Sequence, residues 1–412
     1  MSIPAGPYAS LKIPDFRLFI LARFCITLAI QIQAVVVAWQ VYEITNDPLS
    51  LGLIGLAEAI PSICVSLYAG HVADSVKRKK IIVACTATLV ACSVALLFFT
   101  MDPGNFLLNH GVTPIYTVIF LSGIARGFLS PALFSYMPQL VPRELYSNAV
   151  TWNSTLWETA SISGPAIGGV IYGFWGLTTA YIADASLMAG GLLFALALTN
   201  KDLPPKTDEH GVVEKIRAGL RFVFRNPIIL SAISLDLFAV LFGGAVALLP
   251  IFANEILKVG QEGLGVLRSA PSVGALAMAF YITHHPIKRN TGKILLCAVA
   301  GFGVCMILFA LSTNFWLSMF LLMMSGMFDC ISVIIRSTLL QTLTPENMKG
   351  RVSAVNHIFI GSSNEIGMFE SGVAARMLGV IPSVIFGGCM TIAVVGVTGW
   401  VSKSLRSLQR VH

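Results

Sequence analysis

The fold of this chain is decided by the stretch Gly70-His71-Val72-Ala73-Asp74-Ser75-Val76-Lys77-Arg78-Lys79-Lys80. It lies between two long apolar runs and carries four consecutive cations after a single aspartate. Only 11% of the chain is charged, so the cluster is conspicuous. Cytoplasmic loops of membrane proteins carry an excess of Lys and Arg. The stretch therefore predicts a short cytoplasmic loop between two membrane spans.

The composition agrees with a multi-pass membrane protein. The chain has 412 residues, of which 56% are hydrophobic, and its mean hydropathy is +0.80. The net charge of +7 falls in gaps between apolar runs, which argues against a nucleic-acid surface. All eight cysteines lie within apolar runs and form no Cys-x-x-Cys pair, so we expect neither disulfides nor a metal site. The apolar run after Phe16 lacks a small-residue cleavage site, and we expect no cleavable signal peptide.

Hydropathy and loop signals predict twelve spans, each close to the ~20 residues that a membrane helix needs. The first six cover 17–42, 50–73, 80–100, 114–137, 146–172 and 176–199. The second six cover 228–253, 263–284, 293–313, 315–342, 351–378 and 381–402. We therefore expect an all-α membrane protein with a six-helix half at 1–200, a linker at 201–226 and a second six-helix half at 227–412.

The basic residues orient these spans. Most of the 27 Lys and Arg residues lie at the two ends of the chain and in the even-numbered gaps, which predicts cytoplasmic termini. In the linker, Val213–Phe224 places Ile216, Leu220 and either Val223 or Phe224 opposite Lys215 and Arg217. This spacing predicts a basic amphipathic helix, which lies on the inner leaflet, joins the two halves, or does both.

The two halves also resemble each other. Gln139-Leu-Val-Pro-Arg-Glu144 returns as Gln341-Thr-Leu-Thr-Pro-Glu346, and a second basic loop at 288–293 corresponds to the first. Weak internal symmetry of this kind is typical of duplicated transporters, whose binding site lies between the repeats.

Ionisable residues within the predicted spans are the candidates for function. A charge at mid-span costs about 2.5–3.5 kcal/mol, so such groups must be paired, neutralised or placed on a watery cavity. We expect a proton-coupling or substrate cavity to include Glu58, Arg126, Glu158, Asp236, Asp329, Arg336, Glu365 and Glu370. The alternative is that polar groups merely hydrogen-bond helices together. The sequence leaves Asp184 open between a cavity and the periphery.

The opening stretch resembles the loop motif G-x-L-A-D-R-x-G-R-K of the major facilitator superfamily. Gly70, Ala73, Asp74, Arg78 and Lys79 match it, whereas Ser75 and Lys77 depart from it. The resemblance implies the major facilitator fold and a cytoplasmic gate formed by Gly70, Asp74, Arg78 and Lys79, in which Asp74 pairs with arginine.

Two further resemblances narrow the expectation. Gly164-Pro165-x-x-Gly168-Gly169 resembles the antiporter signature of the fifth span, without its upstream glycine. The segments from Asp329 to Gln341 and from Ser363 to Gly372 resemble the branch that contains the enterobactin exporter and macrolide efflux proteins. That branch implies efflux. Arg126 lies where many proton-coupled members of the superfamily have a fourth-span arginine.

The sequence thus predicts a proton-coupled exporter of a small amphipathic molecule, such as a siderophore or a drug, in a bacterial inner membrane. We expect a monomer among membrane lipids, with no cofactor other than the proton motive force. An uptake symporter or a lipid transporter of the same fold is the alternative. An intramembrane enzyme is a remote one, because no nucleophile–base or His/Asp metal spacing lies within the spans. The chain has no Gly-x-x-x-x-Gly-Lys-Ser/Thr loop for direct use of ATP.

Overall fold

The computed structural model describes residues 8–101, 106–201, 212–243, 245–285, 290–345 and 348–408. Some side chains within its helices lie outside the description, among them those of the predicted site residues Asp74 and Glu365 and the environment of Gly70. Every regular element in the described ranges is a helix. The prediction of an all-helical chain is confirmed.

The chain divides into two compact units. Unit 1 comprises Met1–Thr45 and Ala57–Glu209, and unit 2 comprises Asn46–Leu56 and His210–His412. The first turns of the second long helix therefore belong to unit 2, and the rest of that helix belongs to unit 1.

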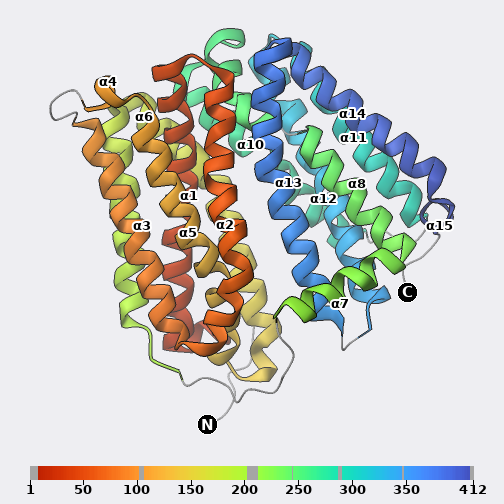
Figure 1. Ribbon diagram of the computed structural model, residues 1–412, viewed down its shortest axis with the longest axis horizontal. Coiled ribbons are helices and arrows are strands. Elements are labelled where there is room, and N and C mark those ends of the chain that lie inside the picture. Colours follow the sequence, from red (N-terminus) through yellow and green to blue (C-terminus); the bar gives the residue numbers. More distant parts are fainter. Residues whose placement is uncertain are drawn as a thin grey trace. The chain divides into compact units, whose positions relative to one another are not determined.

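Unit 1 is built on long helices (Figure 1). They are α1 (Pro14–Thr45), α2 (Pro48–Ser75), α3 (Arg78–Thr100), α5 (Thr113–Tyr136) and α6 (Tyr146–Ala197). Short helices connect them: η1 (Ser10–Lys12), α4 (Phe106–His110), η2 (Met137–Gln139) and η3 (Arg143–Leu145). Both α1 and α2 begin with proline, which suits the first helical position because its missing N–H has no partner there in any case.

The opening stretch is mostly helical. Helix α2 continues to Ser75 and α3 begins at Arg78, so only Val76 and Lys77 separate the two helices. The loop is therefore shorter than the sequence predicted.

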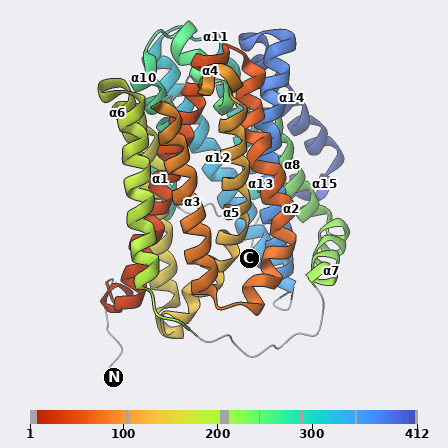
Figure 2. The ribbon, with the colours of Figure 1, turned by 60° about the vertical axis from the view of Figure 1, so that its left-hand side comes forward.

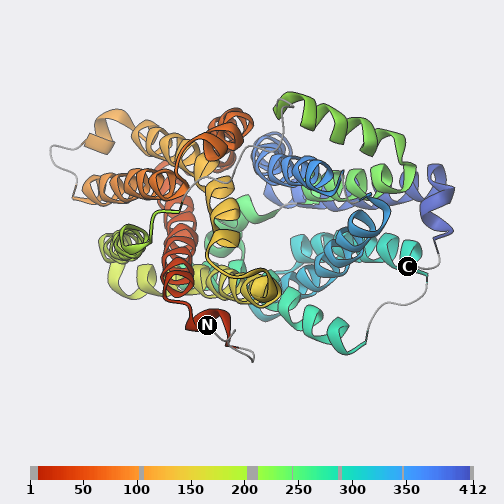
Figure 3. The same ribbon diagram turned by 90° about the horizontal axis from the view of Figure 1, so that it is seen from below.

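Helix α6 folds back on itself at Gly176. This residue has φ +81° and ψ 174°, in the left-handed region that favours glycine, and it separates legs 146–175 and 177–197. The contacts of each leg with α1 show the reversal. On the first leg, Gly164, Gly168 and Tyr172 contact Gln31, Ile32 and Glu43 of α1 in turn. On the second leg, Tyr181, Asp184 and Gly191 contact Gln40, Gln33 and Ile26 of α1 in turn. The residue numbers of the contacted α1 residues increase along the first leg and decrease along the second, so the two legs run in opposite directions. Figures 2 and 3 show the yellow-green second leg beside α1.

Unit 2 has more interruptions. Its elements are α7 (Val212–Arg225), α8 (Pro227–Gly243), η4 (Ala245–Leu248), α9 (Leu249–Ile251), η5 (Phe252–Ile256), α10 (Gly260–His284), α11 (Thr291–Leu311), α12 (Phe315–Leu343), α13 (Lys349–Leu378), α14 (Val380–Val401) and α15 (Lys403–Arg406). The span predicted at 228–253 falls within the candidate membrane span Pro227–Ile256, in which short 3-10, α and π turns follow α8. Pro250 lies in this segment and cannot donate a backbone hydrogen bond, which favours irregular turns.

Ten helices in the described part of the chain are long and apolar enough to cross a membrane. One of them, 148–197, contains both legs of α6. Helix α13 is not among the ten, although it has 30 residues, and it carries Lys349, Arg351, Glu365, Glu370 and Arg376.

Helix α7 covers the predicted amphipathic segment. Figure 1 shows it crossing the lower ends of α8 and α13. Val223 is fully buried and packs in one cluster with Ile229 of α8 and Val352 and Val355 of α13. The apolar face that we expected on the inner leaflet therefore packs, at least at Val223, against helices of unit 2.

Candidate functional site

The first candidate centre lies in unit 1, where α2 meets α5. Arg126 of α5 forms an ion pair through Nη1 with Oε1 of Glu58 on α2, and both side chains are about one-fifth exposed. Gly123, one turn before the arginine, lets the helices approach, because a Cβ there would lie 2.6 Å from the carbonyl oxygen of Glu58. The structure thus brings together two of the predicted residues.

Asp184 lies deep in the interior of the same unit. Its side chain is fully buried on the second leg of α6. Gln33 of α1 donates through Nε2 to its Oδ2 at 3.1 Å, and the same Nε2 lies 3.4 Å from the hydroxyl of Ser93 on α3. The other carboxyl oxygen, Oδ1, has no hydrogen-bond partner among the described residues. Asp184 therefore does not lie at the periphery of unit 1.

Further polar residues of α1 hold the legs of α6 in place. Tyr181 donates to Gln40 at 2.6 Å, and Tyr172 donates to Glu43 at 2.6 Å. The sequence analysis missed these residues. The signal was present, because Gln33 and Gln40 are seven residues apart and therefore share a helix face.

The second centre lies in unit 2, between α8 and α12. Arg336 forms an ion pair through Nη1 with Oδ2 of Asp236, and both side chains are more than nine-tenths buried. A small cavity large enough for a water molecule borders the pair and is lined by Asp236, Asp329 and Ser332 together with apolar side chains. The predicted residues Asp236, Asp329 and Arg336 therefore share one centre.

The remaining predicted acids stand apart from these pairs. Glu158 on the first leg of α6 and Glu370 on α13 are half-buried. Neither forms an ion pair with a described residue. The side chain of Glu365 lies outside the described residues.

The glycines of the antiporter-like motif make close helix contacts. A Cβ on Gly164 would lie 2.5 Å from Cβ of Gln31, and one on Gly168 would lie 3.1 Å from Cα of Ile32. Pro165 and Gly169 are also buried. The motif lets the first leg of α6 pack closely on α1.

The predicted gate is described only in part. Arg78 is buried at the start of α3 and donates through Nη1 to the carbonyl oxygen of Ser135 near the end of α5, at 2.9 Å. Lys79 is half-buried. The side chain of Asp74 and the surroundings of Gly70 lie outside the described residues, so their role in a gate stays a prediction.

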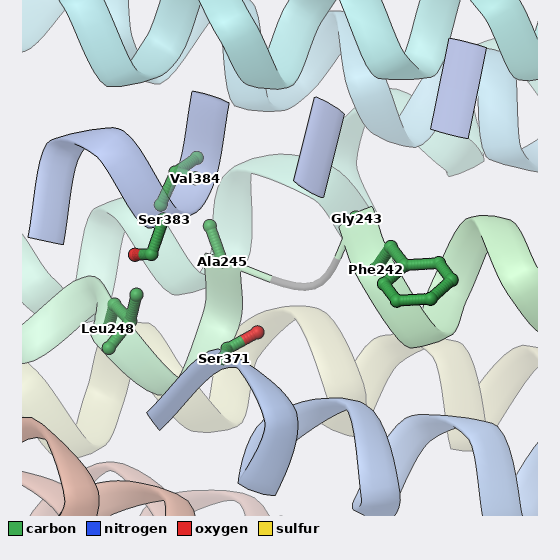
Figure 4. A pocket seen from close by; sticks show the side chains of 7 residues that line it. All are labelled: Phe242, Gly243, Ala245, Leu248, Ser371, Ser383 and Val384. Carbon is green, nitrogen blue, oxygen red and sulfur yellow. The ribbon is translucent and has the colours of Figure 1, made fainter. Parts of the chain in front are cut away.

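A second small cavity of unit 2 lies where α8 ends (Figure 4). Its lining is Phe242, Gly243, Ala245, Leu248, Ser371, Ser383 and Val384. The lining contains no ionisable group, and Ser383 donates its hydroxyl to the carbonyl oxygen of Val380 on its own helix, at 2.7 Å. This cavity offers little chemistry beyond packing. In the described residues no cluster of His, Cys, Asp and Glu could hold a metal ion.

The family of the chain follows from its similarity to known proteins. The profile of the transmembrane secretion effector family, a branch of the major facilitator superfamily, matches residues 5–409. This chain belongs to that family. Similar curated proteins include the enterobactin exporter EntS of Shigella dysenteriae serotype 1, 26% identical over 83% of this chain and 80% of the relative. EntS of Shigella boydii serotype 4 is 28% identical over the same shares of the two chains.

Solved structures of other transporters share the fold of this transmembrane secretion effector. The peptide-transporter-family protein PepTSo has a TM-score of 0.75 at 13% identity and covers 98% of this chain and 99% of its own. A bacterial homologue of the lysosomal transporter Spinster has a TM-score of 0.69 at 14% identity, covering 98% and 97%. The chain is thus a multi-pass transporter of the bacterial inner membrane and not an enzyme, as the sequence predicted.

Proposed function

We propose that this transporter exports a small amphipathic molecule, such as a siderophore or a drug, by proton-coupled antiport. The observation that carries the proposal is the match over nearly the whole chain to a secretion effector family, with relatives named enterobactin exporters. Secondary transport needs no bound cofactor, and the proton motive force supplies the energy. A proton that crosses 100 mV releases about 2.3 kcal/mol, enough for roughly a fiftyfold gradient if one charge moves per substrate molecule.

The proposed topology has twelve spans and cytoplasmic termini. The two legs of α6 supply two spans, since they run in opposite directions along α1. Helix α13 supplies the twelfth, because 30 residues at 1.5 Å each make a rod of about 45 Å, longer than the ~30 Å hydrocarbon core. Its charges at 349, 351 and 376 lie near its ends, where long side chains can reach the interface.

In the proposed mechanism, each unit contributes one arginine–carboxylate centre to alternating access. In a low-dielectric interior, such a pair is stable only while both groups are charged. Protonation of Glu58 or Asp236 would release Arg126 or Arg336. The freed arginine would then hold an anionic substrate or another carboxylate, so proton binding and substrate binding would compete.

Export and uptake can be distinguished in everted membrane vesicles. An exporter accumulates substrate in these vesicles when a proton gradient, acidic inside, is imposed. Enterobactin, a macrolide and a fluorescent lipid serve as probes for the siderophore, drug and lipid hypotheses. Accumulation of enterobactin or of the macrolide that collapses with a protonophore supports proton-coupled export. Gradient-driven loss of the probe supports uptake, and movement of the lipid alone supports a lipid transporter.

A Glu→Gln and Asp→Asn scan tests the coupling. The scan covers Glu58, Glu158, Asp236, Asp329, Glu365 and Glu370. We expect at least one neutral variant to lose gradient-driven accumulation while it still exchanges labelled for unlabelled substrate. If every variant accumulates substrate like the parent chain, coupling through these acids is wrong.

A further inference from the structure

We propose that Asp184 is a proton-binding group of unit 1 and the alternative partner of Arg126 when Glu58 is protonated. The inference rests on the proposed proton coupling and adds a residue that lay outside the predicted site. It starts from the geometry around the buried carboxyl group.

Asp184 is surrounded by neutral polar groups rather than by a direct ion pair. Gln33 donates to Oδ2, whereas Oδ1 is buried without a hydrogen-bond partner in the part of the chain that the structure describes. A buried carboxylate that lacks a partner on one oxygen is costly. In its protonated form the same group has an O–H of its own to donate, and it carries no charge. The described geometry therefore suits a carboxyl group that holds a proton.

The surroundings of Asp184 come from three other helices. Helix α1 contributes Gln33, α3 contributes Ser93 and Cys92, and α5 contributes Arg126, the one charged group among them. Arg126 lies within electrostatic range of Asp184, and Glu58 of α2 holds that arginine. Tyr181, one turn before Asp184, already donates its hydroxyl to Gln40. Arg126 is therefore the cation available to balance a negative Asp184.

The guanidinium group of Arg126 has hydrogen-bond donors that Glu58 does not use. Its Nη1 engages Glu58, while its Nε is buried and has no hydrogen-bond partner among the residues that the structure describes. A guanidinium has five N–H donors and is always charged. If Glu58 becomes neutral, Arg126 is a buried cation without a counterion, which is the costly state. A shift toward Asp184 restores a pair inside the same unit.

Unit 2 repeats this composition. There Arg336 pairs with Asp236, its Nε is also buried without a hydrogen-bond partner among the described residues, and Asp329 lines the same cavity as Asp236. Each centre thus combines one arginine, one paired acid and one further acid. Asp329 was among the predicted site residues, whereas the role of Asp184 was left open by the sequence.

The exchange balances in charge and protons. A proton binds the carboxylate of Glu58 and breaks its ion pair with Arg126. The carboxyl group of Asp184 then releases its own proton and pairs with Arg126. One proton enters and one leaves, so the centre has a single anion opposite a single cation both before and after the exchange.

Infrared spectroscopy of the purified full chain in lipid nanodiscs tests the inference without any substrate. The spectrum of the parent chain minus that of Asp184→Asn should contain, at neutral pH, the C=O stretching band of a protonated carboxyl group, which shifts in heavy water. Asp184→Glu should keep such a band at a displaced position, which controls for misfolding of the Asn variant. The same difference measured in a Glu58→Gln background should lose the band, because Arg126 then draws Asp184 into its charged form. In a Glu158→Gln background the band should stay, because Glu158 forms no ion pair with any residue that the structure describes.

Two results would overturn the inference. One is a difference spectrum without a protonated-carboxyl band; the other is a band that persists unchanged in the Glu58→Gln background. Neither outcome depends on transport, so a parent chain that drives accumulation of enterobactin but lacks the band contradicts this inference alone. A chain that has the band but shows no gradient-driven transport contradicts the proposed function instead.

Discussion

Gly123 lies directly against the backbone of Glu58, so close that a methyl group on the glycine would meet the glutamate carbonyl oxygen at 2.6 Å. The ion pair between Glu58 and Arg126 depends on this approach of α2 and α5, because the arginine follows the glycine by three residues on the same helix. Two helices whose backbones meet this closely leave no room for a branched side chain.

Gly123→Val should therefore force α5 away from α2 and abolish transport. Overpacking of this kind costs about 1–3 kcal/mol of stability. The measurements are thermal unfolding in detergent and accumulation in everted vesicles. Gly190→Val is the matched control, because a Cβ at Gly190 on α6 meets no heavy atom within 4 Å. Equal losses in both variants would contradict the argument.

Asp236→Asn should destabilise unit 2 strongly. The substitution leaves Arg336 as a buried cation without its counterion, which costs about 3–5 kcal/mol. The double variant Asp236→Asn/Arg336→Met should recover much of this stability, since both charges are gone, but should not recover transport. Thermal unfolding of the two single variants and the double variant gives the coupling energy. Additive losses would show that the pair does not act as a unit.

Asp47→Ala should cost more stability than Arg376→Ala, although the two residues form one ion pair at 3.8 Å. The pair is solvent-exposed, and such pairs contribute at most about 1 kcal/mol. Asp47 has a second role, because it accepts from the backbone N–H of Leu49 at 3.2 Å at the start of α2. Loss of such a cap costs about 1 kcal/mol in addition. Thermal unfolding should rank parent chain, Arg376→Ala and Asp47→Ala in falling order.

Arg78→Ala should lower transport and stability together, because the buried guanidinium holds the carbonyl oxygen of Ser135 at the end of α5. Lys80→Ala, two residues away and exposed, is the control and should behave like the parent chain.

The resemblance of the opening stretch to a gate motif leads to a separate prediction for Asp74. Asp74→Asn should lower turnover, measured as accumulation per protein molecule, while the protein remains in the membrane. Unchanged turnover would reduce the stretch to a topological signal.

Neighbouring residues of α7 distinguish its two interpretations. Val223 is fully buried against α8 and α13, whereas the side chain of Phe224 is 62% exposed. Val223→Ser should therefore lower the unfolding temperature, and Phe224→Ser should leave it unchanged in detergent. If α7 also lies on the inner leaflet, Phe224→Ser together with Arg221→Gln should weaken the protection of α7 against protease in vesicles of anionic lipid. Protection that is equal in neutral and anionic vesicles would leave α7 as a linker helix only.

The sequence predicted the helices and the family well because both can be recognised from residues that lie close together in the chain. Apolar runs and basic gaps mark spans wherever they pack, and the loop motif is contiguous. Asp329 and Arg336, both among the predicted site residues, are seven residues apart and therefore share a face of one helix. The partner of Arg336 is Asp236 from another helix, a pairing that spacing within a helix cannot indicate.

The remaining differences arise from contacts between distant segments. Asp184 could not be placed from its own helix, because its depth depends on Gln33, some 150 positions earlier in the chain. The short 3-10, α and π turns between Ala245 and Ile256 were not anticipated, because an irregular segment that is as apolar as a helix has the same hydropathy. Burial of Val223 in unit 2 follows from the position of α13, which the linker sequence does not encode.

The reversal at Gly176 has a consequence for biosynthesis. The two legs of α6 are joined by a single non-helical residue. No hydrophilic loop between them could therefore stay in water while the second leg is inserted into the bilayer. In the proposed topology, this pair must pass from the ribosome into the lipid as one closed hairpin, with Phe174 and Trp175, both largely exposed, at its tip. Aromatic rings favour the membrane–water interface. The tip would therefore come to rest at the far interface and fix the depth of the hairpin before the rest of the chain is made.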